Sequence, residues 1–237
     1  HRNLDNTYIR NDFMEMNTEA TYKHLKKINF SKNQLRDLFE YARKIEIDPI
    51  CTPFDLLSLK DIIELKPSAI KIASADLLNF DLIKEASKFR VPIILSTGMH
   101  NEIEIINSVN FTRNLTKNFI LLHCISTYPA PDESLNLRYI SRLKKLTGCL
   151  IGYSSHDDGI LPSVLASSLG AVIIEKHITW NKNAIGPDHN ASLELEDFAK
   201  MVSGIKKIDN MLGDSSVEKK ISQGEMINRT NLSKSIY

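Results

Sequence analysis

The sequence predicts an α/β fold built around a parallel sheet. Short apolar runs, rich in β-branched residues, recur along the chain, and an amphipathic stretch separates each from the next. Each run is almost continuously apolar, as expected of a parallel strand that is covered on both faces. The six runs are Ile47–Cys51, Ala69–Ala73, Val91–Leu95, Phe119–His123, Cys149–Ile151 and Ala171–Ile174.

Six consecutive strand–helix units with right-handed connections form either an open sheet or a closed barrel. Two observations favour the barrel. No Gly-x-Gly-x-x-Gly motif follows any run, which disfavours the dinucleotide-binding open sheet. Polar residues follow almost every run, as they do at the active-site end of a barrel. We therefore predict a (β/α)8 barrel of the TIM type that lacks about two N-terminal strands in this chain.

The stretches between the runs predict helices, and polar residues mark where most of them begin. Ser31 and Gln34 form a capping box before the first helix. Pro162 lies in the first turn of a later helix that ends near Gly170. The other expected helices are 56–65, capped by Asp55 and stopped by Pro67; one from Asn79 or Asp81 to about Phe89; one after Asn101; 137–146, opened by Asn136; and 195–212.

Composition predicts a soluble, cytoplasmic chain with one domain. The 237 residues are 42% hydrophobic, and 30 basic residues face 29 acidic ones, so no basic excess indicates binding to nucleic acid or to a membrane. No apolar run approaches the roughly 20 residues that span a bilayer, and the polar start does not resemble a signal peptide. Three dispersed cysteines are expected to be buried free thiols. We assign 1–214 to the barrel and 215–237 to a linker.

Two histidines follow neighbouring strands of the predicted barrel. His156 comes shortly after the fifth run and His177 ends the sixth. Consecutive strand ends are neighbours in a barrel, so both imidazoles can point into one axial cavity. Two imidazoles with a carboxylate suit a divalent metal. Two unrelated polar histidines would have the same spacing.

Hydroxyl residues occupy equivalent positions at the ends of other runs, and one lysine lies near them. Lys71 lies inside an apolar run, and hydroxyl donors beside a lysine suit a phosphate or carboxylate ligand. An internal lysine can also form a Schiff base, and hydroxyl residues also simply end strands. Asp188 follows a rigid Gly-Pro turn that could present it to a polyol. The hydroxyl residues are Thr52, Ser74, Ser96 and Ser154.

Seven short motifs in a fixed order resemble the sialic acid synthase family, which comprises N-acylneuraminate, legionaminate and pseudaminate synthases. The resemblance covers nearly the whole chain, and the ordered set is far more specific than any single motif. The motifs are Lys71–Asp76, Leu95–Met99, Leu121–Cys124, Tyr128–Pro131, Gly152–His156, Glu175–Thr179 and Gly186–His189.

The resemblance implies an enzyme that condenses phosphoenolpyruvate with an N-acylated hexosamine, such as N-acetylmannosamine, and releases phosphate. It implies a divalent metal, Mn²⁺ or else Mg²⁺ or Co²⁺, on His156 and His177. Lys71, His177, Asp76 and Asp188 would be the catalytic residues. It assigns phosphoenolpyruvate to Thr52, Lys71, Ser74, Ser96 and Ser154, and the sugar to Tyr128, Asp76 and Asp188.

Four positions depart from the family's usual pattern. The family often has Glu where Asp76 stands and Asn where Ser126 stands, which could alter the sugar contacts. Around His156, Ser155 and Asp157 replace the more usual Asp and Thr, so the residues that support this histidine could differ.

The resemblance also bears on the ends of the chain. It implies that two further strands, with a metal-binding Glu, precede the chain, and that 215–237 leads to an antifreeze-like (SAF) domain. It further implies a cytoplasmic homodimer. We therefore expect the chain alone to be catalytically incomplete. A lysine Schiff-base aldolase that uses Lys71, and a non-enzymatic barrel fragment, remain the alternatives.

Overall fold

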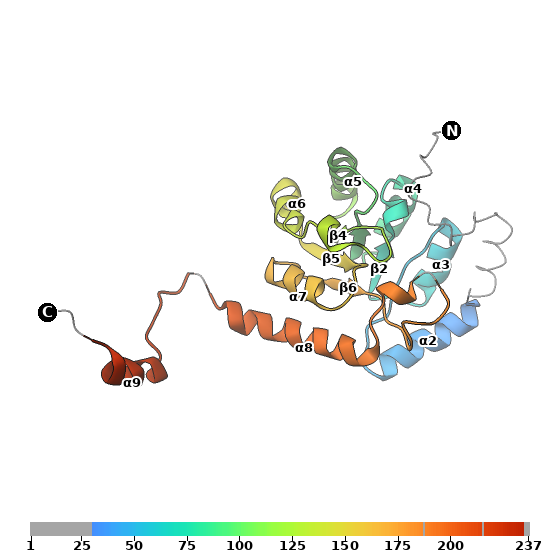
Figure 1. Ribbon diagram of the computed structural model, residues 1–237. Helices are drawn as coiled ribbons and strands as arrows, with labels where there is room; N and C mark the ends of the chain where they lie inside the picture. The colour runs from blue at the N-terminus through green and yellow to red at the C-terminus, as the bar shows by residue number, and fades with distance from the viewer. Residues whose placement is uncertain (1–29, 187, 215, 235–237) are drawn as a thin grey trace.

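The structure, a computed structural model, describes residues 30–186, 188–214 and 216–234. Six parallel strands form one curled sheet in the order β1-β2-β3-β4-β5-β6, so each strand pairs with its neighbour in sequence (Figure 1). This is an α/β half-barrel, and it confirms the six predicted strand–helix units. The strands are β1 Ile50–Cys51, β2 Ala69–Ile72, β3 Ile93–Ser96, β4 Phe119–Cys124, β5 Ile151–Ser155 and β6 Ile174–Lys176.

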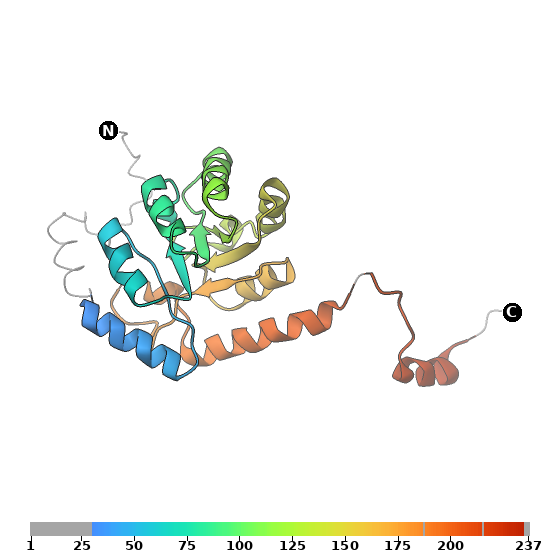
Figure 2. The same cartoon turned by 180° about the vertical axis from the view of Figure 1, so that it is seen from behind.

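Helices connect the strands and cover the outside of the sheet (Figure 2). The capping box predicted at Ser31 is present, the helix expected after Asn101 begins there with a capping box of its own, and Asn79 rather than Asp81 caps its helix. The helices are α2 Lys32–Lys44, α3 Leu56–Glu64, α4 Phe80–Ser87, α5 Glu102–Leu115, α6 Tyr139–Thr147, α7 Leu161–Ser168, α8 Leu195–Leu212 and α9 Gln223–Leu232, with 3₁₀ turns at Ser74–Asp76, Asp132–Ser134 and His189–Ala191.

The hydrophobic core lies between the sheet and the helices. Ile70, Ile72, Leu95 and Leu121 are fully buried strand residues in this core, and Leu82 of α4 packs against them. A second, small cluster on the other face of the sheet contains Ile94 and Leu122. Burial on both faces explains why the strands read as continuous apolar runs in the sequence.

Two predictions of local structure were wrong. The last two strands lie further along the chain than expected, because β5 includes Ser154 and Ser155, which pair with Glu175 and Lys176 of β6. Asn136 does not open α6: its φ is +42°, and the helix begins three residues later. The segment assigned to a linker contains a helix that was not predicted: a capping box at Ser222 begins α9, which lies apart from the sheet (Figure 1).

The expected polar N-terminal segment lies in residues 1–29, outside the described residues. In the part of the chain that the structure describes, no helix combines the length and apolar character needed to cross a membrane.

Candidate active site

A cavity of about 460 Å³ opens at the carboxyl ends of the strands. Eight of the ten candidate residues line it, although they come from six different segments of the chain. The parallel sheet brings them together because every strand ends at the same edge. The eight are Thr52, Lys71, Ser74, Ser96, Tyr128, Ser154, His156 and His177.

One side of the cavity presents a buried cation and hydroxyl groups. Lys71 is 8% exposed, and its Nζ donates a hydrogen bond to the carbonyl of Ile72 at 3.3 Å. Burial lowers the pKa of Lys71, and the charge of Glu175 partly opposes this effect. Ser96 is 2% exposed, and its hydroxyl has no hydrogen-bond partner among the described residues. An orphaned hydroxyl beside a weakly paired ammonium is the donor set that an anion would complete.

Glu175 shares this side of the cavity. Its Oε1 accepts a hydrogen bond from Ser154 Oγ at 2.7 Å, and its Oε2 lies 3.6 Å from Lys71 Nζ. Its position two residues before His177 gives both side chains the same facing on β6. Glu175 therefore points into the cavity, but toward Lys71 and Ser154.

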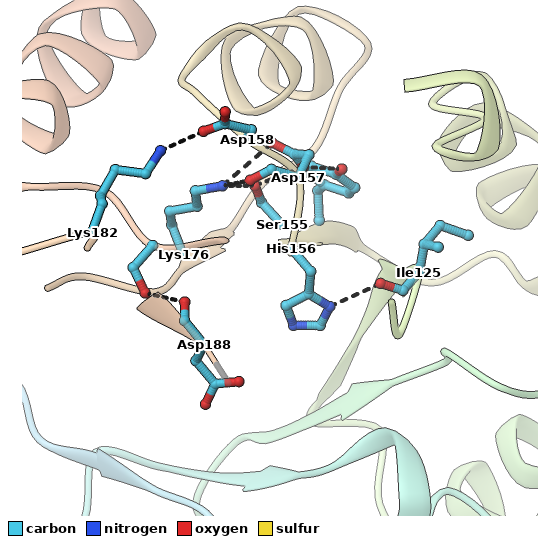
Figure 3. Close-up of polar contacts among 10 residues, drawn as sticks. Ile125, Ser155, His156, Asp157, Asp158, Lys176, Lys182 and Asp188 are labelled. Atoms are coloured by element: carbon cyan, nitrogen blue, oxygen red, sulfur yellow. Dashed lines mark hydrogen bonds and ion pairs between the residues drawn. The ribbon is translucent and has the colours of Figure 1, made fainter. Parts of the chain in front are cut away.

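The other side of the cavity presents two imidazoles and a phenol. The ring centroids of His156 and His177 are 5.4 Å apart. His156 Nδ1 lies 2.9 Å from the carbonyl of Ile125, which fixes Nδ1 as the donor (Figure 3). Its Nε2 lies 3.1 Å from Tyr128 Oη. Burial raises the pKa of Tyr128 to about 12, so its hydroxyl keeps its proton. Burial lowers the pKa of His177, with the neighbouring His156 acting in the same direction.

The two imidazoles are the residues predicted to hold a divalent metal. A ring held through Nδ1 to a backbone carbonyl is the orientation typical of metal-ligating histidines, although Tyr128 Oη, which contacts Nε2 here, would have to give up that position to an ion. Within the described residues, however, no group of three or more His, Cys, Asp or Glu side chains is placed to hold an ion. The pair therefore fits a divalent metal only if a further ligand comes from elsewhere.

Two candidate residues lie outside the residues that line the cavity. Asp76 is half-buried in the 3₁₀ turn after β2, and its carboxylate accepts a hydrogen bond from Asn79 Nδ2 at 2.9 Å. Asp188 is exposed in the loop after β6, where its backbone carbonyl accepts a hydrogen bond from Ser192 (Figure 3).

Residues beyond the candidate set also line the cavity. Cys124 ends β4, is buried, and lies 3.6 Å from Ser74 Oγ and 3.7 Å from His156 Nδ1. Its place at the end of an apolar run was available in the sequence, but a buried free thiol explained it equally well. Glu175 could be found from its parity with His177, whereas nothing in the sequence distinguishes Phe54, which joins the cavity from the loop after β1.

Comparisons with known proteins identify relatives along most of the chain. The N,N′-diacetyllegionaminic acid synthase of Campylobacter jejuni is 38% identical over 93% of this chain and 66% of its own length. An uncharacterised protein of Methanocaldococcus jannaschii is 41% identical over 87% of this chain and 61% of its own. The chain thus spans less than two thirds of the length of these curated relatives.

A solved structure has the same fold. The N-acetylneuraminic acid synthetase of Leptospira borgpetersenii superposes with a TM-score of 0.83 at 36% identity, and the match covers 92% of this chain and 76% of that one. The NeuB family profile matches residues 2–217. The chain belongs to the NeuB family, whose relatives include sialic, legionaminic and pseudaminic acid synthases.

Proposed function

We propose that this protein is a nonulosonate synthase, which condenses phosphoenolpyruvate with an N-acylated hexosamine such as N-acetylmannosamine and releases phosphate. Family membership supports the class of reaction. The observation that carries the proposal is the meeting of two sets of groups in one cavity: the ammonium of Lys71 with the orphaned hydroxyl of Ser96, and the imidazoles of His156 and His177.

The chemistry needs an anion site beside an electrophile. The methylene carbon of phosphoenolpyruvate bonds to the sugar aldehyde carbon, water adds at C2, and cleavage of the C–O bond expels phosphate. Lys71 would hold the phosphate and stabilise its developing charge, together with the hydroxyls of Thr52, Ser74, Ser96 and Ser154. The phenol of Tyr128 would contact the sugar from the opposite wall.

The two acidic candidates would act on the acceptor from outside the cavity wall. Asp188 is exposed in the loop beyond His177, where its carboxylate can accept hydrogen bonds from sugar hydroxyls. Asp76 would do the same from the turn after β2, and either carboxylate could move a proton.

His156 and His177 would hold the divalent metal, for which Mn²⁺ is our first choice and Mg²⁺ or Co²⁺ the others. When bound there, such an ion polarises the aldehyde oxygen as a Lewis acid. We further propose that the active protein is a cytoplasmic homodimer, and that residues 215–237 link the barrel to an antifreeze-like (SAF) domain.

Calorimetric titration of phosphoenolpyruvate tests the anion site. Lys71→Met should weaken binding at least tenfold, whereas Lys84→Met, which removes an exposed lysine of α4, should leave it unchanged. In the protein expressed from its complete reading frame, Lys71→Ala should lower kcat/KM for phosphate release by about 2–4 kcal/mol of transition-state stabilisation. A loss of less than tenfold would assign Lys71 a structural role.

One observation favours a second function. Because burial lowers the pKa of Lys71, its amine is easier to deprotonate, as a Schiff-base lysine must be. Borohydride reduction in the presence of a keto acid, followed by mass spectrometry of the peptide that contains Lys71, separates the two functions. A covalent adduct on Lys71 would favour a Schiff-base aldolase over the synthase.

A further inference from the structure

A buried charged network lies behind the two histidines, on the opposite face of β5 and β6. Ser154 near the end of β5 and His156 directly after it line the cavity. Because side chains alternate along an extended chain, Tyr153, Ser155 and Asp157 face away from the cavity. Lys176 likewise alternates with the cavity-lining Glu175 and His177 on β6. The network consists of Tyr153, Ser155, Asp157 and Lys176.

Asp157 and Lys176 form the centre of this network. Both side chains have zero exposure, and Lys176 Nζ lies 3.3 Å from Asp157 Oδ1. The other carboxylate oxygen, Oδ2, accepts hydrogen bonds from Tyr153 Oη and, at 2.8 Å, from Ser155 Oγ. A buried ion pair is retained at a cost in desolvation, and full satisfaction of its polar atoms limits that cost.

The network ties together the backbone next to His156 and the backbone next to His177. Lys176 Nζ donates to Ser155 Oγ at 3.0 Å and also to the backbone carbonyl of Asp157, which directly follows His156 (Figure 3). Lys176 itself directly precedes His177. Figure 3 shows the Lys176 ammonium pointing at Asp157 and Ser155, whereas the His156 ring points away toward Ile125. One side chain thus fixes the spacing of the two imidazoles from behind.

We propose that Asp157 and Lys176 are positioning residues that hold the His156 and His177 rings in the orientation needed for the reaction. The role in the reaction rests on the proposed function. The positioning of the two rings does not, because it can be measured in the chain without substrate. Neither residue lines the cavity, so neither is assigned contact with substrate.

Long-range ¹H–¹⁵N spectra of the histidine rings test the proposal without substrate or metal. Wild type should show one sharp ring pattern for His156 with Nδ1 protonated. Asp157→Asn and Lys176→Met should shift or broaden the signals of His156 and His177 and speed exchange of the His156 Nδ1 proton at least tenfold. If either single variant fails to fold, the double variant replaces it, because it leaves no uncompensated buried charge.

Two controls separate positioning from general loosening. His100 lies in the loop between β3 and α5, outside the network, with Nδ1 2.8 Å from the carbonyl of Gly98, and its signals should not change. Asp158→Asn with Lys182→Met removes the adjacent exposed ion pair and should leave all three rings unaffected.

Unchanged ring signals of His156 and His177 in a folded variant would overturn the proposal, as would an equal change at His100. In the complete protein, a lowered kcat with an unchanged KM for phosphoenolpyruvate would support it further. An inactive wild type with the expected spectra would count against the proposed function and leave the positioning role standing.

Discussion

Replacement of Ser96 by Ala should change stability and ligand binding in opposite directions. Ser96 ends β3 with its side chain against the cavity, and its hydroxyl is buried without a partner among the described residues. The substitution removes one oxygen and leaves the backbone and the remaining packing unchanged. It therefore isolates the cost of keeping this donor ready for a ligand.

The expected changes in stability and in affinity both follow from whether the Ser96 hydroxyl has a hydrogen-bond partner. A buried polar group without a partner costs about 1–3 kcal/mol, so its removal should raise the free energy of unfolding by about 1 kcal/mol. If Ser96 donates to a bound anion, loss of that charged hydrogen bond costs about 1.5–3 kcal/mol. This corresponds to roughly 10–150-fold weaker binding of phosphoenolpyruvate.

Urea unfolding followed by circular dichroism, and calorimetric titration with phosphoenolpyruvate, measure the two quantities. Ser163→Ala is the matched control, because its hydroxyl in α7 is also buried and has no partner in the described part of the chain, but lies away from the cavity. That variant should gain stability and keep its affinity. The reasoning about Ser96 is refuted if Ser96→Ala loses more than about 1 kcal/mol of stability or binds phosphoenolpyruvate as tightly as wild type.

Three further substitutions test the fold. Gly152→Ala should destabilise by at least about 1–3 kcal/mol, because the new Cβ would lie 2.5 Å from Leu122 Cδ2 and 2.7 Å from a backbone oxygen; a wild-type urea midpoint would contradict this. Asn101→Ala removes the cap of α5 and should cost about 1 kcal/mol in the same assay. The Arg142 hydrogen bonds lower the pKa of Glu102, so this pair stabilises the fold above the unfolded carboxyl pKa and loses its effect as pH falls through the lower folded value. Glu102→Gln should therefore be less stable than wild type at pH 7, and the difference should close below about pH 4; an equal difference at pH 3 would show that the charge is not responsible.

The sequence was sufficient to predict the strands, their order of appearance and most helix starts. The apolar runs were unambiguous because the parallel strands are buried on both faces, and side chains such as Ser31 and Asn101 make the hydrogen bonds that capping requires. The end of β5 was missed because Ser154 and Ser155 are polar. One lines the cavity and the other belongs to the buried network, so the apolar run in the sequence stops before the strand does. The α9 helix was missed because its ten residues bury no side chain, so its capping box was the sole local sign.

The candidate site was predictable to the extent that it depends on strand ends. The order of the parallel strands brings eight residues to one cavity. This order can be predicted without knowing any side-chain conformation. The direction in which a side chain points from a loop is a different matter. Asp76 and Asp188 follow their strands at four and twelve residues, whereas His156 follows β5 directly, and the path of such a loop has no periodic signature in the sequence.

Glu175 gives the cavity its present charge balance and bears on how an anion could enter. Its carboxylate occupies two of the donors that the resemblance assigns to phosphoenolpyruvate, the Ser154 hydroxyl and, at 3.6 Å, the Lys71 ammonium. A second anion on these donors would be repelled by the Glu175 carboxylate, which is itself 40% exposed. The Ser96 hydroxyl, in contrast, has no partner among the described residues, and the Lys71 contact is long for an ion pair. An incoming anion can therefore bind first at Ser96 and Lys71, and must displace the Glu175 carboxylate to reach Ser154.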